Sequence, residues 1–175
     1  CIFKYCISHS ISGCFNIQKC SCSIQYNIFS SNHGKFGGCF HSYVMQEFTL
    51  NQNLFDNNIA DYFGAGYIDI LHSKLRSFQN NFTRNYGTKW VGALELYTSK
   101  CDTKIQFTIF DHNSAEHCAA YFDLSSGKNH NNLNTALFIN NSAKRRGGSI
   151  TDFSYQMSAN YSNCAFIGNK CIEGN

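Results

Sequence analysis

The chain has 175 residues, of which 43% are hydrophobic, 15% aromatic and 14% charged, with a formal net charge of +3 at pH 7. This apolar content excludes general disorder, and the length fits one domain with a continuous core. The net charge is too small and too scattered to indicate binding to nucleic acid. No run of apolar residues approaches the roughly 18 that are needed to span a bilayer. Proline is absent, which suits long ladders of paired strands.

A Phe-x-x-Asn motif returns along the chain at near-constant intervals. An imperfect copy opens the chain, where Cys6 stands three residues after Phe3. Six full copies follow at Phe29–Asn32, Phe55–Asn58, Phe78–Asn81, Phe110–Asn113, Phe138–Asn141 and Phe166–Asn169. The Phe-to-Phe steps are 26, 26, 23, 32, 28 and 28 residues. Such a period indicates a stacked repeat architecture.

A second signal, made of small residues closed by a large one, falls between successive copies. Its copies are Ser12–Phe15, Gly37–Phe40, Gly64–Tyr67, Val91–Leu94, Cys118–Tyr121 and Gly147–Ile150. Glycine lets neighbouring backbones approach closely, and the large residue re-enters the core. Period-two alternation over 104–110 is typical of a strand. Leucine is too sparse for leucine-rich repeats.

The two signals predict an all-β fold, a single-stranded parallel β-helix solenoid of about six coils with about 27 residues each. We expect the Phe rings of successive coils to stack and the Asn side chains to hydrogen-bond along the axis. Each Asn is expected to take left-handed backbone at the bend after its strand. Residues 1–175 are interpreted as one segment of a longer array, because no capping element is recognisable at either end.

The ten cysteines lack paired Cys-x-x-Cys blocks, so no metal or other cofactor is expected. Cys14 and Cys39 share one repeat position, and their Cα atoms would lie about 4.8 Å apart in successive coils. That spacing permits a disulfide, but a stack of buried free thiols is equally compatible with the pattern. Many cysteines together with the glycosylation sequons at Asn81, Asn140 and Asn160 favour an extracellular or cell-surface location.

Carboxylates at matching repeat positions are the candidates for acid–base chemistry. Asp123 and Asp152 each lie two residues after the large residue of the small-residue signal, in neighbouring coils. They could serve a glycoside hydrolase or polysaccharide lyase, with Arg145 or Arg146 nearby. They could equally be outward polar residues on one strand face. No catalytic residue is assigned.

The alternation of Phe-x-x-Asn with segments such as Gly147–Ile150 resembles the repeats of the chlamydial polymorphic outer-membrane proteins. The six motif copies carry this resemblance over essentially the whole chain. It implies a right-handed β-helix that is displayed at a surface and used in adhesion, and it implies no catalytic residues. Contact with a membrane would come only through an anchor outside this segment.

We therefore predict an adhesion or interaction scaffold that binds a host or neighbouring cell-surface protein or glycan. The longest step, between Phe78 and Phe110, predicts the largest loop at 87–103, where Trp90 and Tyr97 would supply aromatic contacts. A carbohydrate-active β-helix enzyme using Asp123 and Asp152 is the alternative. A third hypothesis is a scaffold without ligands, which only spaces other domains.

Overall fold

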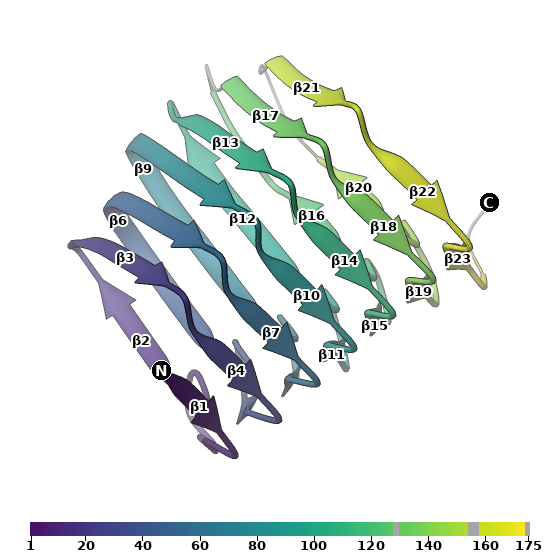
Figure 1. The fold of residues 1–175 in the computed structure, drawn as a ribbon, viewed down its shortest axis with the longest axis horizontal. Helices are drawn as coiled ribbons and strands as arrows, with labels where there is room; N and C mark the ends of the chain where they lie inside the picture. The colour runs from purple at the N-terminus through teal and green to yellow at the C-terminus, as the bar shows by residue number, and fades with distance from the viewer. Residues whose placement is uncertain (128–129, 154–157, 174–175) are drawn as a thin grey trace.

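The computed structural model describes residues 1–127, 130–153 and 158–173, without the side chains of Val44 and Ser158. These residues form an all-β solenoid of about six coils, in which every paired strand is parallel to its neighbour in the next coil. The predicted fold class is confirmed. Figure 1 shows the coils side by side from the N-terminus to the C-terminus. No helix within the described ranges is long and apolar enough to cross a membrane.

Three parallel sheets run along the solenoid. The first contains β1 (Ile2–Lys4), β4 (Ile28–Ser30), β7 (Leu54–Asp56), β10 (Asn81–Thr83), β14 (Ile109–Asp111), β18 (Leu137–Ile139) and β22 (Ala165–Ile167). The second contains β5 (His33–Gly34), β8 (Ile59–Ala60), β11 (Tyr86–Gly87), β15 (Ser114–Ala115), β19 (Ser142–Ala143) and β23 (Lys170–Cys171).

The third sheet has two arms, which two long strands join. The rear arm in Figure 1 contains β2 (Phe15–Gln18), β12 (Leu94–Ser99), β16 (Tyr121–Asp123) and β20 (Ile150–Asp152). The front arm contains β3 (Ser21–Gln25), β13 (Asp102–Gln106), β17 (His130–Asn134) and β21 (Ser158–Ser162). Strands β6 (Phe40–Asn51) and β9 (Gly66–Phe78) pass through both arms.

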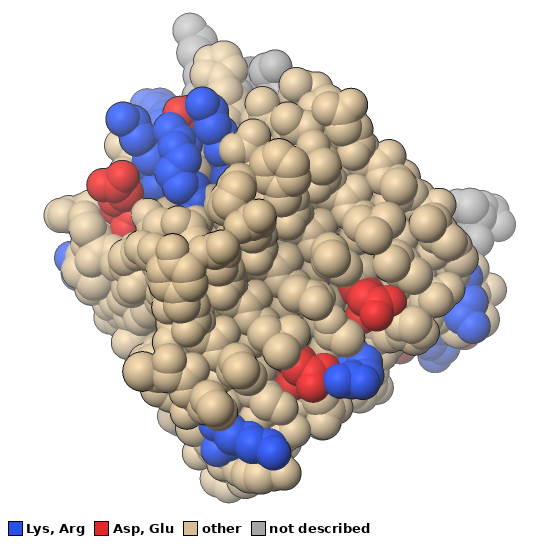
Figure 2. Space-filling model, in the orientation of Figure 1, with Lys and Arg blue, Asp and Glu red and all other residues tan. Residues whose placement is uncertain are grey.

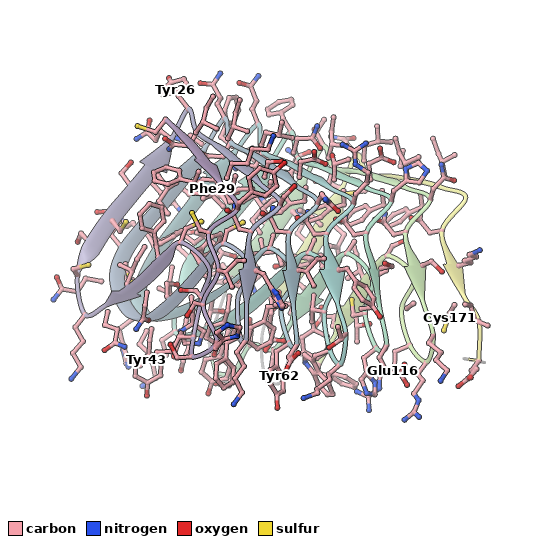
Figure 3. The ribbon with its side chains drawn as sticks, turned by 90° about the horizontal axis from the view of Figure 1, so that it is seen from below. Tyr26, Phe29, Tyr43, Tyr62, Glu116 and Cys171 are labelled. Atoms are coloured by element: carbon pink, nitrogen blue, oxygen red, sulfur yellow. The ribbon has the colours of Figure 1, made fainter. Side chains whose placement is uncertain are left out.

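A stack of phenylalanine rings fills the interior behind the first sheet. Its members are Phe3, Phe29, Phe55, Phe82, Phe110, Phe138 and Phe166. Neighbouring ring centroids are 4.7–5.1 Å apart and the planes are within 10° of parallel. The rings therefore repeat at about the spacing of the strands that carry them. Figure 3 shows Phe29 inside this stack.

The prediction that Phe78 and Asn81 belong to the ladders is wrong. The chain contains a further copy, Phe82–Asn85, and Phe82 pairs in register with Phe55 and Phe110. Phe78 ends β9 with 37% of its surface exposed. The steps become 27 and 28 residues rather than 23 and 32, which keeps the strands paired without a four-residue slip.

The asparagines of the ladder hydrogen-bond from coil to coil, as predicted for the other copies. The members are Asn32, Asn58, Asn85, Asn113, Asn141 and Asn169. Each Nδ2 except that of Asn169 donates to Oδ1 of the next asparagine at 2.8–3.0 Å. All six Nδ2 atoms also donate to the carbonyl of a stacked phenylalanine. Each backbone N–H except that of Asn169 donates to the same neighbouring Oδ1. The carboxamides thus satisfy one another inside the protein.

The left-handed residue of each bend is not the ladder asparagine. It is the residue just before it, with φ between 49° and 63°, at Tyr5, Ser31, Asn57, Arg84, His112, Asn140 and Gly168. This placement bends the chain while the asparagine itself points inward. The expectation of left-handed backbone at the asparagine is corrected accordingly.

Close backbone approach explains the small-residue signal, as predicted. A Cβ atom added at Gly64 would lie only 1.8 Å from the carbonyl oxygen of Gly92 in the next coil. A shorter second asparagine ladder, which the sequence reasoning missed, joins Asn27, Asn53 and Asn80 at the corner before the first sheet.

Candidate functional site

The outer surface of the rear arm carries aromatic and carboxylate side chains in register across several coils. Because side chains alternate along a strand, the neighbours of the inward residues point outward. One outward row runs through His41, Tyr67, Glu95 and Phe122. Asp69 and Tyr97 are paired in a second outward row. The exposed Tyr43 lies close enough to interact with Tyr67.

The connections that lead into the rear arm add a third line of rings beside these rows. Phe36 and Tyr62 stack with centroids 5.0 Å apart, and Trp90 lies 4.5 Å from His117. The guanidinium of Arg146 lies 5.6 Å from the centre of the Trp90 ring. We call the surface formed by this line and the two outward rows the rear aromatic face. Tyr43 and Tyr62 point outward along it in Figure 3.

Glu95 lies beneath this face and is only 5% exposed. Burial raises the pKa of Glu95 to about 8, and a hydrogen bond with Trp90 opposes that shift. Its Oε2 atom has no hydrogen-bond partner within the described chain. Burial also lowers the pKa of His41. At neutral pH both side chains are therefore largely uncharged.

Trp90 and Tyr97 lie on the rear aromatic face, but not on the large loop that the sequence reasoning expected. The 32-residue step does not exist, because Phe82 and Phe110 are 28 residues apart. Trp90 lies in a short connection before β12, and Tyr97 lies within β12 itself. Tyr67 is outward because Gly66, not Tyr67, pairs with the inward Phe40. Glu95 is detectable in the sequence only as the residue after inward Leu94.

Asp123 and Asp152 are neighbours in register, but they do not face an exposed groove. Tyr121 lies against the interior Phe110, and Asp123 is on the same side of β16 two residues later. Asp123 is completely buried, so the interpretation as an outward residue on the strand face is wrong for Asp123, whereas Asp152 in the next coil is exposed. Its burial raises its pKa to about 6, against the hydrogen bonds that it accepts.

The oxygens of Asp123 are already engaged. They accept hydrogen bonds from Ser125 Oγ, from Asn131 Nδ2 at 2.7 Å and from Tyr121 Oη at 3.3 Å. Asp152 accepts from Tyr161 Oη at 2.6 Å. A hydrolase or lyase needs both carboxylates open to substrate, and the buried Asp123 does not meet that condition.

The two arginines considered with this pair point elsewhere. Arg145 is paired with Glu116 at 2.8 Å, and Arg146 lies over Trp90 and Phe153. Both therefore belong to the outer side of the coils.

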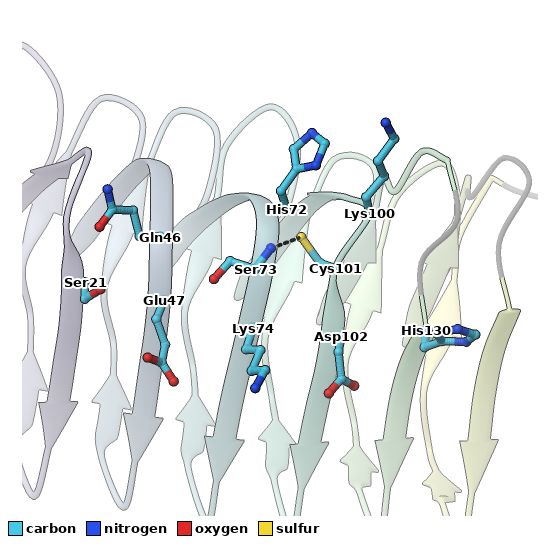
Figure 4. A pocket seen from close by; sticks show the side chains of 10 residues that line it. All are labelled: Ser21, Gln46, Glu47, His72, Ser73, Lys74, Lys100, Cys101, Asp102 and His130. Carbon is cyan, nitrogen blue, oxygen red and sulfur yellow. Dashed lines mark hydrogen bonds between the residues drawn. The ribbon is translucent and has the colours of Figure 1, made fainter.

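A shallow groove of about 520 Å³ lies along the corner between the two arms, beside a cluster of basic side chains (Figures 2 and 4). Its row of outward residues alternates in charge, from Glu47 through Lys74 to Asp102. Arg76 closes an ion pair with Asp102 at 2.6 Å. Opposite charges on adjacent coils therefore compensate one another, and the groove has no strong preference for either sign of ligand.

Cys14 and Cys39 occupy neighbouring coils, and both are free thiols in the structure. Cys39 is fully buried, as expected for a stacked small hydrophobe. Among the residues that the structure describes, no three His, Cys, Asp or Glu side chains gather in a way that could hold a metal ion.

No family model, curated protein or solved structure matches the chain.

Proposed function

We propose that this chain is an extracellular or surface-displayed adhesion scaffold, and that its rear aromatic face binds a neutral carbohydrate chain. The observation that supports the proposal is the succession of accessible rings on consecutive coils of one face. Rings anchor recognition surfaces because they bury much apolar area at little conformational cost. Tyr43 is 47% exposed, and Tyr62, Tyr67, Trp90 and Tyr97 are half-buried.

The shape of the face favours an elongated ligand. Coils repeat at about 4.8 Å, so a chain lying along the solenoid axis would meet new contacts at every coil. The flat faces of sugar rings are apolar and can pack on aromatic rings, while tyrosine hydroxyls provide polar contacts at the edges. Glu95 and His41 are largely uncharged at neutral pH, so neither of them provides an ionic partner for a ligand.

The test uses rings that can be removed without damaging the fold. The double variant Tyr43→Ala/Tyr97→Ala is suitable, whereas Trp90 interacts with Glu95 and Phe122 and would perturb the face on removal. Binding is measured against immobilised neutral hexasaccharides and against intact cells. Since hot-spot residues contribute more than about 1 kcal/mol each, we expect binding to weaken by roughly 10-fold or more.

Phe107→Ala is the matched control, because Phe107 is 48% exposed but packs edge-on against Phe78 at the end of the front arm. It should leave binding unchanged, and circular dichroism should show the same fold for all variants. Equal loss in the control and the double variant would contradict a site on the rear face. Absence of binding by the parent chain to any probe would favour a scaffold without ligands.

A further inference from the structure

The first coil departs from the asparagine ladder at one position. The backbone N–H of Cys6 donates to Asn32 Oδ1 at 3.0 Å, just as the N–H of Asn32 donates to Asn58 Oδ1 at 3.1 Å. Cys6 therefore occupies the ladder position of its coil. A thiol stands there in place of the carboxamide that the six following coils carry.

Cys14 occupies, in the same coil, the place that Cys39 has in the next one. The backbone N–H of Cys14 donates to the carbonyl of Cys39 at 2.8 Å. In the second coil the ladder residue reaches its cysteine, because Asn32 Nδ2 lies 3.9 Å from Cys39 Sγ. Coil symmetry places Cys6 against Cys14 in the same way. Burial raises the pKa of Cys14, and a hydrogen bond and charge repulsion with Cys6 raise it further, as expected for adjacent sulfurs.

We propose that Cys6 and Cys14 are a redox modification site, at which a disulfide closes the first coil on itself. The competing pair, Cys14 with Cys39, is less suitable. Those residues occupy equivalent positions just before β2 and β6 in successive coils, joined by a backbone hydrogen bond, so their Cβ atoms point the same way and stay about 4.8 Å apart. A disulfide prefers Cβ atoms about 3.8 Å apart whose vectors converge. Cys6 and Cys14 lie on facing segments of one coil, where a Cβ atom added at Gly13 would lie 3.0 Å from the carbonyl oxygen of Cys6.

The bond forms by exchange with a low-molecular-weight disulfide, the class of oxidant found in oxidising compartments. The Cys6 thiolate attacks one sulfur of that disulfide and releases one small thiolate. The Cys14 thiolate then attacks the Cys6 sulfur of the mixed disulfide and releases the second. The two protons of Cys6 and Cys14 end on the two small thiols, and the two electrons of the thiol pair reduce the external disulfide. Cys14 reacts second because its raised pKa, caused first by burial, leaves little thiolate to attack the external disulfide.

Peptide mapping separates the two pairings, because Lys4, Lys19, Lys35 and Lys74 are trypsin sites. The folded chain is equilibrated with oxidised and reduced glutathione, alkylated and digested. We expect peptide 5–19, which contains Cys6 and Cys14, to be unalkylated and lighter by two hydrogen atoms. A cross-link from peptide 5–19 to peptide 36–74, which contains Cys39, would overturn the assignment. So would a link to peptide 20–35 or full alkylation of Cys6 and Cys14.

Two variants complete the test. Cys6→Asn restores the ladder residue of the other coils, so the fold is retained while Cys14 becomes open to alkylation. Cys171→Ser, at the other end of the described chain, should leave the oxidised peptide 5–19 unchanged. Retention of the two-hydrogen loss in Cys6→Asn would assign it to chemistry other than this disulfide.

Discussion

The interior and the rear aromatic face use the same strands in opposite ways. Inside, one column repeats Phe at every coil and another repeats Asn, and each side chain finds its partner in the identical residue of the next coil. Outside, the row through His41, Tyr67, Glu95 and Phe122 changes chemistry at every step. The interior therefore fixes the winding, while the outer rows can vary without changing it.

The largest expected effect comes from breaking the interior column at the position that the sequence leaves ambiguous. Phe82→Ala removes a completely buried ring that stacks on Phe55 and Phe110 at 4.7 and 5.1 Å. It should lower the free energy of unfolding by about 3–5 kcal/mol, measured by urea denaturation. Phe78→Ala removes a ring on the surface and should cost less than about 1 kcal/mol.

These two variants decide the register directly. If Phe78→Ala proved the more destabilising, the fourth coil would carry Phe78 in the stack, and the shift of four residues would extend to Asn81 and Asn85. Circular dichroism of both variants shows whether a loss of stability comes with loss of strand structure.

The next effect concerns the neutral carboxyl beneath the rear aromatic face. Burial raises the pKa of Glu95 from 4.5 to about 8, so the folded state holds a proton that the unfolded state has lost between those values. Stability is then full below about pH 4.5 and falls as the pH rises towards 8. Glu95→Gln removes this loss, and we expect it to stabilise the protein by roughly 3 kcal/mol at pH 7.

Unfolding measured from pH 4 to pH 9 checks this prediction. The pH dependence should flatten above pH 6 in Glu95→Gln, while burial of Asp123 still contributes between about 3.8 and 6. Glu47→Gln, at an exposed carboxylate, should follow the parent curve. An unchanged curve for Glu95→Gln would show that Glu95 is already ionised in the folded protein at neutral pH.

The fold could be predicted from the sequence because the Phe and Asn residues of the interior columns repeat, and a repeat can be recognised without coordinates. The sequence did not settle the register of the fourth coil, where Phe78 and Phe82 both begin a Phe-x-x-Asn copy within four residues. The sequence pattern also predicted, wrongly, that Asp123 points outward from its strand. Burial of that carboxyl depends on Asn131, a donor from the other arm of the same coil, and no local pattern reveals such a partner. Of the rear aromatic face, the sequence predicted only Trp90 and Tyr97 as contact residues. The other members were missed because the outer rows do not repeat from coil to coil.

The smallest effect lies at the corners that join the interior to the outer surface. Thr135 has φ of 56°, a left-handed conformation that is costly for a β-branched side chain. Thr135→Gly should stabilise the protein by about 1 kcal/mol, seen as a higher urea midpoint, since glycine adopts this conformation without steric cost. Thr108→Gly is the control. Thr108 is buried and directly follows Phe107, which itself takes the left-handed conformation, so the glycine relieves no strain at position 108 and should destabilise the protein. A loss of stability in Thr135→Gly would mean that the threonine side chain, which bonds Asn134 Oδ1 at 2.9 Å, outweighs the backbone strain. In that case the corners, like the outer rows, would be selected for their side chains rather than for the bend.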